Sequence, residues 1–425
     1  MLRLIYSFLL YLLQPFIWLR LFLRGRKAPQ YRKRWAERYG FCRGKVQPDG
    51  IMLHSVSVGE TLTAIPLVRA LRYRYPTLPI TVTTMTPTGS ERVLSAFGDD
   101  VHHVYLPYDL PGSVNRFLNQ VRPKLVIVME TELWPNLIHQ LHRRQVPLVI
   151  ANARLSARSA NGYLKLGKTV RDMMHKITLI AAQNQEDGER FIQLGLKRSQ
   201  LAITGSLKFD ISVTPELSSR ALSLRRQWAP HRPVWIATST HDGEEQIILN
   251  AHRALLERFP DLLLILVPRH PERFSVAEQL TASAGLKFVT RSSGVVPSEQ
   301  DQVIIGDTMG ELMLLYGVAD FAFVGGSLVE RGGHNPLEPA AHGLPVIVGP
   351  HTFNFKDICS KLQLAEGLIV VSNAEELVEA AERLLNDEAC RRSYGQNAAN
   401  VLMQNQGALE KLLALLEPYL PTRIH

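Results

Sequence analysis

Residues 322–350 read AFVGGSLVERGGHNPLEPAAHGLPVIVGP, and this stretch decides the fold. The apolar run from Phe321 to Val324 predicts a buried strand. A short helical segment then stops at Gly343, and the run from Leu344 to Val348 predicts the next strand. A strand, a glycine-rich loop, a helix and a strand in so few residues predict an α/β unit with a parallel sheet.

Two glycine pairs, Gly325-Gly326 and Gly332-Gly333, belong to the loop of this unit. Asn335 suits the N-cap of the helix that follows, and Pro336 suits its first position. Glu338 follows Asn335 at the spacing of a capping box. Glycines beside a helix N-terminus let backbone N–H groups approach an anion closely, so the segment predicts a phosphate site. Plain capping and a tight turn are the alternative interpretation.

Strands and helices alternate along most of the chain, in two series. The first series has apolar runs at 51–58, 79–84, 125–129, 146–151, 179–182 and 201–204. The second has runs at 234–237, 262–267, 288–289, 303–305, 321–324, 346–348 and 368–371. Because 425 residues are too many for one ordinary core, we predict two domains of the α/β class. The predicted parts are a first doubly wound domain at 25–210, a linker at 211–232 and a second at 233–425, with a cleft between the domains.

The formal charge of +9 is concentrated at the N-terminus. Residues 1–49 hold eleven Lys and Arg residues but only Glu37 and Asp49 as acids, and the rest of the chain is balanced. A nucleic-acid binder would need a basic face on its folded domains, so we do not expect nucleic acid as a partner. The three cysteines form no Cys-x-x-Cys pair, which fits a reducing compartment.

Residues 1–24 are predicted to be a membrane anchor. Leu4 to Leu19 carries no charge, and at about 1.5 Å per residue it measures about 24 Å, against about 30 Å for a hydrocarbon core. Counted to Leu23, with Arg20 reaching the surface, the segment is just long enough to span. Trp18 and the basic residues that follow suit a headgroup boundary and keep that side cytoplasmic. Spanning and lying in the interface both remain open.

Three groups of polar residues in the first series follow predicted strands. Ser57-Val58-Gly59-Glu60 lies at a strand-to-helix turn, where open α/β sheets bind ligands, and Glu60 there suits a general base. The same residues also fit a capping box. Glu130 and Glu132 follow another strand, and Lys208 follows the last strand, where a cation can meet an anionic substrate. A solvated helix start and an ordinary surface lysine are the alternatives.

In the second series, Pro268-Arg269 closes one strand and Met309-Gly310-Glu311 follows another. These loops and residues 332–338 are predicted at one edge of one sheet, with Arg269 suited to a phosphate or carboxylate. His241 to Glu245 resembles a metal cluster, but acids in a first helical turn are the commoner explanation. The spelling G-x-x-x-x-G-K-[ST] at 162–169 is not interpreted as a nucleotide loop, because no strand leads into it.

These motifs together resemble the 3-deoxy-D-manno-octulosonic acid (Kdo) transferases of lipopolysaccharide synthesis. The residues that carry the resemblance are Ser57 to Glu60, Glu130 to Asn136, Gly205 to Asp210, Pro268 to Pro271 and Gly332 to Glu338. The resemblance covers nearly the whole chain. It implies a two-domain GT-B glycosyltransferase that moves Kdo from CMP-Kdo to a lipid A precursor (lipid IVA), with inversion, without a metal or cofactor, and in two successive transfers.

The resemblance also implies the roles of individual residues. Glu60 is the expected general base, and Glu130 and Lys208 are expected to support the transition state. The expected CMP ligands are Pro268, Arg269, Met309, Gly310, Glu311, Asn335, Pro336, Leu337 and Glu338. The expected location is the inner membrane, with a single N-terminal anchor, the domains on the cytoplasmic side, and the acceptor lipid and the membrane surface as partners.

Two further functions stay open as alternatives. One is another nucleotide-sugar transferase or epimerase on the same two-domain frame, and the other is a membrane-tethered nucleotide-binding protein without catalysis. A physical tension concerns Glu60, since a helix N-terminus favours a charged carboxylate and should therefore lower its basicity.

Overall fold

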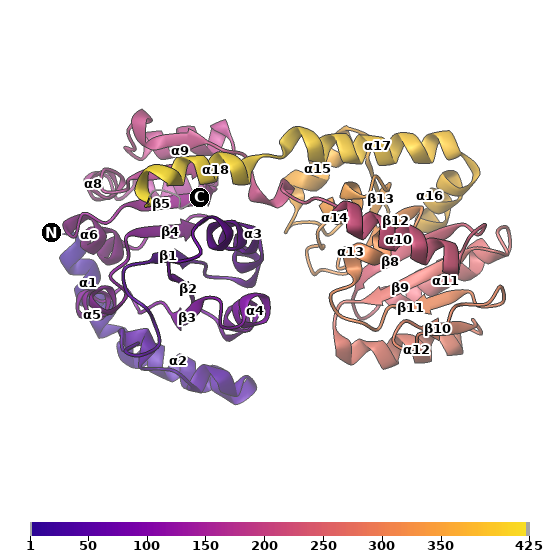
Figure 1. Ribbon diagram of the computed structural model, residues 1–425, viewed down its shortest axis with the longest axis horizontal. Helices are drawn as coiled ribbons and strands as arrows, with labels where there is room; N and C mark the ends of the chain where they lie inside the picture. The colour runs from indigo at the N-terminus through magenta and orange to yellow at the C-terminus, as the bar shows by residue number, and fades with distance from the viewer. Residues whose placement is uncertain (1, 422–425) are drawn as a thin grey trace. The chain divides into compact units, whose positions relative to one another are not determined.

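The structure, a computed structural model, describes residues 2–421 and divides the chain into two units (Figure 1). The first unit contains the chain up to Asp210 and again from Gln406 onward, and the second runs from Ile211 to Asn405. Each unit is built on one seven-stranded sheet. The predicted α/β class with two doubly wound halves is therefore confirmed, whereas the predicted boundaries need two corrections.

The first sheet has the strand order β3-β2-β1-β4-β5-β6-β7, and every neighbouring pair is parallel. Its strands are β1 (Ile51–His54), β2 (Ile80–Thr84), β3 (His102–Tyr105), β4 (Leu125–Met129), β5 (Leu148–Ala153), β6 (Leu179–Ala182) and β7 (Leu201–Ile203). The sequence pattern missed β3, whose first two residues are histidines that stay half-buried at the sheet edge. The chain leaves the predicted first strand early, at His54 rather than Val58.

Helices cover both faces of this sheet, which explains its continuous apolar strands. They are α3 (Val58–Arg74), α4 (Pro87–Phe97), α5 (Pro111–Val121), α6 (Pro135–Arg143), α7 (Ala157–Leu164), α8 (Lys168–Met174) and α9 (Gln185–Gln193). One core cluster contains residues of α5, α6, α8 and α9, and another contains residues of α3 and α4. Residues 162–169 comprise the end of α7, a short turn and the start of α8, so no strand leads into them, as predicted.

The second sheet has the order β10-β11-β9-β8-β12-β13-β14 and is also parallel throughout. Its strands are β8 (Val234–Thr240), β9 (Leu263–Pro268), β10 (Phe288–Thr290), β11 (Val303–Ile305), β12 (Phe321–Val324), β13 (Val346–Val348) and β14 (Leu368–Val370). Its helices are α10 (Pro215–Trp228), α11 (Glu244–Leu256), α12 (Phe274–Ser283), α13 (Leu312–Tyr316), α14 (Leu337–Ala341), α15 (Lys356–Leu364), α16 (Ala374–Asn386) and α17 (Glu388–Asn405). Core clusters lie on both faces of the sheet.

The predicted linker at 211–232 is wrong, because most of it forms α10. Thr214 caps this helix, and Trp228 at its end is buried in the core of the second unit. Arg225 donates to the carbonyl of Val318 (2.7 Å) and pairs with Asp320 (3.1 Å), which fixes the helix against the domain. The absence of a strand pattern in this stretch reflected an amphipathic helix and not a flexible connection.

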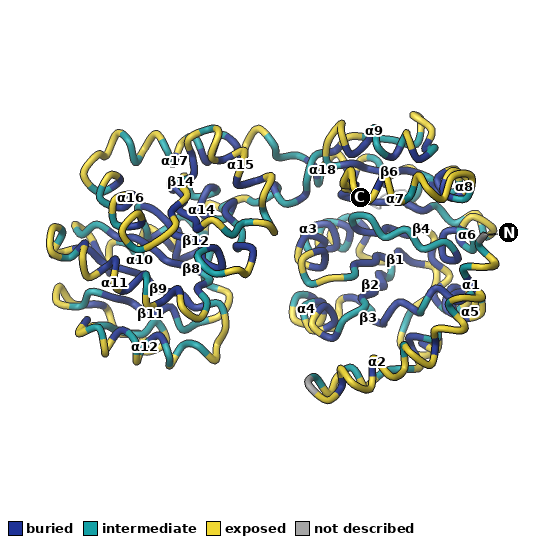
Figure 2. Tube along the Cα trace, turned by 180° about the vertical axis from the view of Figure 1, so that it is seen from behind, coloured by how far each residue is buried: buried dark blue, intermediate teal, exposed yellow. Residues whose placement is uncertain are grey.

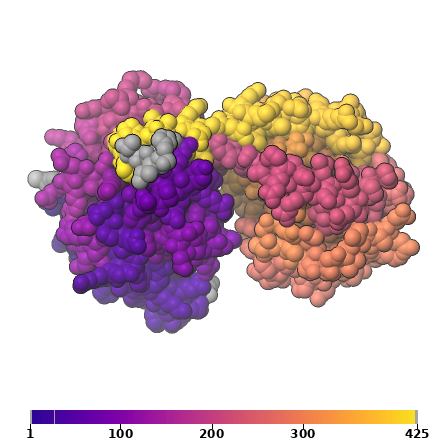
Figure 3. All heavy atoms as spheres, in the orientation of Figure 1, coloured from indigo at the N-terminus to yellow at the C-terminus, as the bar shows by residue number. Residues whose placement is uncertain are grey.

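The C-terminal end of the chain returns to the first unit, which corrects the predicted domain 233–425. Helix α18 (Ala408–Leu416) packs on α3, and its leucines join the core cluster that contains Leu67 and Leu71. The carboxylate of Asp210 accepts hydrogen bonds from the backbone N–H groups of Gly407 and Leu409, both at 2.6 Å. In Figure 3 the yellow atoms of α18 lie against the first unit.

The predicted anchor forms two helices, α1 (Leu2–Leu12) and α2 (Gln14–Lys27). Within residues 2–421, no individual helix has both the length and the apolar character to cross a bilayer; α1 and α2 meet those criteria only as a pair bent by 50°. Their large apolar residues are mostly exposed. Most of the tube along α2 has the colour of exposed residues in Figure 2. On the inner side, the Tyr39 hydroxyl donates to Gln14 (2.7 Å), and the indole of Trp18 donates to Tyr39.

Candidate functional site

The strand order of the first sheet reverses direction between β1 and β4, which lie side by side with His54 opposite Val128. In open α/β sheets, the loops beyond the carboxyl ends of two such strands form the ligand-binding crevice. The loop after β1 leads to Glu60, and the loop after β4 starts with Glu130. The fold therefore brings the loops of these two predicted site residues to one place.

Glu60 lies in the first turn of α3 and its residue is 8% exposed. Its carboxylate accepts hydrogen bonds from the backbone N–H of Val56 (2.8 Å) and from the hydroxyl of Ser57 (2.9 Å). The hydroxyl of Ser57 in turn accepts from the N–H of Glu60 (3.3 Å), so Ser57 is also the N-cap of the helix. The capping interpretation of this motif is therefore confirmed, and the same contacts orient both oxygens of the Glu60 carboxylate.

The pKa of Glu60 is raised above its ordinary value, which resolves the tension noted from the sequence. Burial is the largest cause, and the charges of Glu130 and Glu132 add to it. The hydrogen bonds from Val56 and Ser57 act in the opposite direction. The donors at the helix N-terminus do lower the pKa of Glu60, as expected, but desolvation outweighs them and the net pKa is raised.

Glu130 begins a tightly held loop between β4 and α6. Its φ of 56° is in the left-handed region, which is uncommon for a residue other than glycine, and its N–H donates to the carbonyl of Ala151 (2.9 Å). Glu132 accepts from the indole of Trp134 (2.9 Å), and burial raises the pKa of Glu132. The ring of Trp134 stands edge-on to His54, with centroids 6.0 Å apart. The loop thus covers the carboxyl end of β1.

Lys208 lies on a short 3-10 helix, η4 (Leu207–Phe209), that contacts α3, the helix of Glu60. The side-chain oxygen of Asn152 accepts from the N–H of Leu207 (3.0 Å) and so holds η4 over the end of β5. Asn152 has a φ of 54°, and its buried side-chain nitrogen has no hydrogen-bond partner within the part of the chain that the structure describes. No sequence pattern selects Asn152, because the feature that marks it is an irregular register of β5 in the sheet.

The strand order of the second sheet reverses direction between β8 and β12. At this point the sequence predicts a bound phosphate, but the loop N–H groups bind the carboxylate of Glu244. Its buried carboxylate accepts N–H bonds from His241 (2.9 Å), Gly326 (2.7 Å), Ser327 (3.0 Å) and Leu328 (3.0 Å). The sequence predicts Glu244 as an acid in a first helical turn, and α11 does begin at this residue. The N–H groups of Gly326 and of the two residues after it therefore bind an internal carboxylate. The N–H of Gly325 donates to the carbonyl of Thr238 (2.7 Å), so neither glycine of the first pair offers its N–H to a phosphate.

The second glycine pair folds back on the first. Gly333 donates to the carbonyl of Gly326 (2.8 Å) and His334 to that of Gly325 (3.2 Å). Helix α14 begins at Leu337, one residue later than predicted, with Pro336 at the N-cap position. The side chain of Asn335 accepts from the N–H of Leu337 (3.2 Å), so it still caps this short helix.

Glu338 and Arg269 lie close together beside this loop. Burial raises the pKa of Glu338 to about 7, while the amide of Asn335 and the charge of Arg269 lower it. Arg269 follows β9, of which Pro268 is the last residue, and its N–H donates to the carbonyl of Thr240 (3.0 Å). The predicted residues 268, 269 and 335–338 are therefore gathered at the carboxyl edge of the second sheet.

A histidine pair that sequence reasoning missed belongs to the same edge. The Nε2 atoms of His241 and His334 are 2.8 Å apart and their rings are stacked, so one nitrogen donates and the other accepts. Burial and nearby cations, including Arg269, lower the pKa of His241 to about 4 and that of His334 to about 3. Both rings are thus neutral near pH 7, in a positive environment that suits an anion.

The loop Met309-Gly310-Glu311 follows β11 and is more open. The side chain of Met309 is 57% exposed, and Gly310 has a φ of 83°. The carboxylate of Glu311 accepts two hydrogen bonds from the guanidinium of Arg291 (2.9 and 3.0 Å) and one from Thr308 (2.6 Å). These donors lower the pKa of Glu311, so it is held as an ionised carboxylate whose charge is balanced by Arg291.

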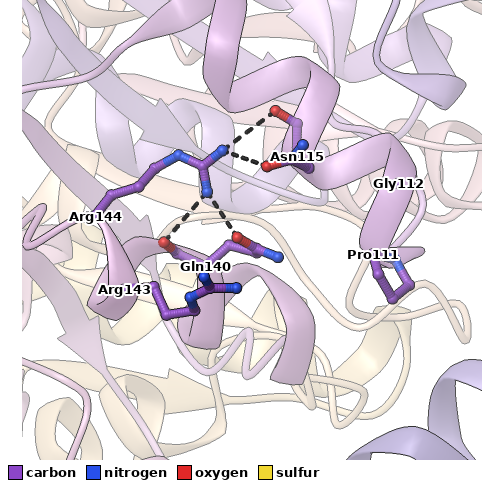
Figure 4. A pocket seen from close by; sticks show the side chains of 6 residues that line it. All are labelled: Pro111, Gly112, Asn115, Gln140, Arg143 and Arg144. Atoms are coloured by element: carbon purple, nitrogen blue, oxygen red, sulfur yellow. Dashed lines mark hydrogen bonds between the residues drawn. The ribbon is translucent and has the colours of Figure 1, made fainter.

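A pocket of about 450 Å³ lies between α5 and α6 in the first unit (Figure 4). Arg144 crosses it and donates to the side chains of Gln140 (2.7 Å), Asn115 (2.5 Å) and Asn119 (2.8 Å). The other lining residues are Pro111, Gly112 and Arg143, so none of the predicted site residues belongs to it. Within residues 2–421, no group of three or more His, Cys, Asp or Glu side chains is arranged to hold a metal ion.

Solved structures share the fold at low sequence identity. UDP-GlcNAc 2-epimerase from Neisseria meningitidis matches 87% of this chain and 100% of its own, with 14% identity and a TM-score of 0.55. A glycosyltransferase from Rickettsia africae matches 88% and 100%, with 12% identity and a TM-score of 0.55. These likenesses support a GT-B-like fold.

Sequence comparison is far more specific. Residues 33–211 match the family model described as 3-deoxy-D-manno-octulosonic-acid transferase, and residues 232–401 match that of glycosyl transferases group 1. A 3-deoxy-D-manno-octulosonic acid transferase of Haemophilus influenzae is 54% identical over 99% of this chain and 100% of its own. One from Bordetella pertussis is 36% identical over 98% and 99%. The chain therefore belongs to the Kdo transferase family of glycosyltransferases.

Proposed function

We propose that this protein transfers Kdo from CMP-Kdo to a lipid A precursor, lipid IVA, with inversion, without a metal, and twice in succession. Membership of the Kdo transferase family supports the sugar and the reaction class. The observation that carries the mechanism is Glu60: a buried carboxylate of raised pKa at the switch point of the first sheet.

In the proposed step, Glu60 takes the proton of an acceptor hydroxyl while that oxygen attacks the anomeric carbon of Kdo. The bond from this carbon to the CMP phosphate breaks, and CMP leaves with the electron pair. Val56 and Ser57 hold both oxygens of Glu60, so the base is oriented before the substrate arrives. Glu130 and Lys208 are proposed to support the charge that develops at the sugar.

The second unit is proposed to bind the cytidylate. Arg269 and the neutral pair His241–His334 supply donors for the phosphate, and residues 335–338 and 309–311 contact the rest of the nucleotide. Since Glu244 occupies the N–H groups of Gly326 to Leu328, the phosphate must rely on side chains rather than on that loop. A cationic, partly buried environment stabilises the leaving CMP without proton transfer to it.

The first two helices are proposed to attach the enzyme to the inner membrane from the cytoplasmic side. Exposed apolar residues of α1 and α2, such as Phe8 (63%) and Phe16 (68%), face away from the domain. Their inner sides are bonded to the domain, which favours a position in the plane of the interface over a span. The exposed Arg20, Arg24 and Arg26 suit anionic headgroups.

The direct test is an assay with CMP-Kdo and lipid IVA, in which products are identified by mass. Glu60→Gln should retain CMP binding, measured by calorimetry, but lose at least about 100-fold in kcat, because general bases contribute about 10²–10⁴. Glu186→Gln, at an exposed position of the same unit, is the matched control and should keep full activity. Full turnover by Glu60→Gln would remove Glu60 from the mechanism.

The fold is also that of an epimerase, so the second candidate function is another transferase or an epimerase that uses a UDP-sugar. Competition at the donor site separates the two, since CMP should displace the donor and UDP should not. A non-catalytic nucleotide-binding protein would bind CMP in the same experiment without any product.

A further inference from the structure

Helix α1 is amphipathic, but it turns its polar face to the domain and exposes its apolar face. Arg3, Tyr6 and Ser7 are spaced so that they share one face of the helix, and this polar face is turned toward the domain. Ser7 is only 6% exposed, whereas Phe8 and Leu12 on the other side are 63% and 56% exposed. A helix that only needed to attach to the domain would bury its apolar face. The buried polar face therefore requires its own explanation.

The main partner of this face is Asn136, whose side chain is fully buried. Its amide oxygen accepts from the guanidinium of Arg3 (3.0 Å), and its amide nitrogen donates to the hydroxyl of Ser7 (3.0 Å) and to the carbonyl of Asp109 (2.6 Å). The hydroxyl of Ser7 also donates to the carbonyl of Arg3 (2.9 Å). Helix α1 thus supplies two of the three groups that hold this side chain.

Asp109 completes the cluster. It is 2% exposed and its carboxylate accepts from the backbone N–H groups of Asn136 and Leu137, both at 2.8 Å, at the start of α6. The hydroxyl of Tyr6 donates to the same carboxylate. Burial raises the pKa of Asp109 to about 7, which shows how far this acid is removed from water. Nothing in the proposed transfer uses these groups.

The position of Asn136 links this cluster of side chains to the loop that carries Glu130 and Glu132. The loop that starts with Glu130 runs directly into α6 (Pro135–Arg143), of which Asn136 is the second residue. At its other end this loop is tied to Ala151 through Glu130. The loop carries Glu130 and Glu132, whose charges act on Glu60. Its two ends therefore set the distance between the three carboxylates.

We propose that α1 is a positioning element of the active site: its polar face holds Asn136 and thereby fixes the loop of Glu130 and Glu132. The proposal rests on the proposed function for its catalytic consequence. The apolar face of α1 is then free to enter a bilayer interface without disturbing the polar face. One short helix thus carries both the apolar face proposed for the membrane and the polar contacts that fix the loop of Glu130 and Glu132.

Two double variants of the full chain separate positioning from attachment, and both leave every charge unchanged. Tyr6→Phe with Ser7→Ala removes the hydroxyls that reach Asp109 and Asn136. Phe8→Ser with Leu12→Ser alters the exposed face of the same helix. Each is assayed with detergent-dispersed acceptor and tested for sedimentation with vesicles of phosphatidylethanolamine and phosphatidylglycerol.

The inner-face variant should bind vesicles as the wild type does but lose about tenfold in kcat with KM unchanged, since small misplacements of catalytic groups are costly. The outer-face variant should lose vesicle binding and keep its kcat in detergent. The single variant Ser7→Thr, which retains the hydroxyl at this position, should have the kcat of the wild type. Full kcat in the inner-face variant, or equal losses in both double variants, overturns the proposal.

A fluorescence measurement tests the coupling without turnover. Trp134 lies in the loop and donates to Glu132, so release of Asn136 should change its emission. The emission of the inner-face variant should therefore differ from that of the wild type. When both proteins also carry Trp134→Phe, this difference should disappear. If wild type does not transfer Kdo, the proposed function fails, but this emission change still decides whether α1 holds the loop. Unchanged emission, like a change that persists without Trp134, contradicts the coupling.

Discussion

Glu60 is subject to two opposing influences that a sequence cannot weigh. Its place in the first turn of α3 and the donors Val56 and Ser57 favour the charged carboxylate. Burial and the neighbouring Glu130 and Glu132 favour the protonated acid, and the balance is a raised pKa. A carboxylate with a raised pKa is a stronger base than an ordinary glutamate, and it acts only after it has lost its proton.

The pH dependence of transfer follows from this balance. Because the base must be ionised, kcat/KM should fall as the pH is lowered through the pKa of Glu60, with a midpoint above the 4.5 of an ordinary glutamate. Removing a neighbouring negative charge favours ionisation, so Glu132→Gln should shift this midpoint to lower pH. The pH profile of kcat/KM measures both effects.

The control for this shift is Glu186→Gln, whose side chain is 77% exposed and lies on α9. It changes the same charge by the same chemistry and should leave the midpoint where it is. A midpoint that moves upward in Glu132→Gln, or moves equally in both variants, would contradict the assignment of Glu60 as the base under the influence of Glu132.

At the scale of elements, the second unit shows how one side chain organises a whole loop. Glu244 at the start of α11 binds four backbone N–H groups, three of them from the loop that follows β12. The loop then positions residues 333–338 through Gly333 and His334. A carboxylate that is part of the protein thus shapes the loop where the sequence indicated an external phosphate.

Glu244→Gln should therefore destabilise the second unit. A glutamine has a single acceptor oxygen, so the N–H groups of Gly326 and His241 would face an amide nitrogen. Buried donors left unpaired cost about 1–3 kcal/mol each, and the free energy of unfolding should fall by at least about 2 kcal/mol. Urea unfolding, followed by the fluorescence of the buried Trp235, measures the change.

Glu375→Gln serves as the matched control, because Glu375 is an exposed acid in the first turn of α16 in the same unit. Its effect should stay within about 0.5 kcal/mol, as for surface substitutions generally. Equal stability of the two variants would mean that Glu244 does not hold the loop.

At the scale of the whole molecule, the basic N-terminal stretch divides into two parts. Arg34 and Lys45 pair with the buried Glu37, at 2.7 Å each, and Arg38 is itself buried. These charges are therefore paired or buried within the first unit. Arg20, Arg24 and Arg26 on α2 are exposed beside apolar side chains, an arrangement that favours the proposed position of α2 at an anionic surface.

Vesicle binding should accordingly depend on lipid charge and on salt. Arg20→Gln with Arg26→Gln should weaken binding to phosphatidylglycerol vesicles by about 1 kcal/mol per charge at low ionic strength, and less at high salt. The control, Arg392→Gln, changes an exposed arginine of the second unit and should have no effect. Binding that ignores both lipid charge and salt would contradict an electrostatic contribution from α2.

The sequence by itself determined the two parallel α/β units and the strand ends that carry Glu60, Glu130, Arg269 and Glu338. Strand patterns are local, and in parallel sheets every carboxyl end meets the same edge, so short-range signals suffice. Only the tertiary structure decided that Glu244 occupies the glycine loop, that α1 turns its polar face to Asn136, and that the last helix returns to the first unit. These contacts join residues 82, 129 and 197 positions apart, and no local pattern encodes which distant partner a buried polar group will find.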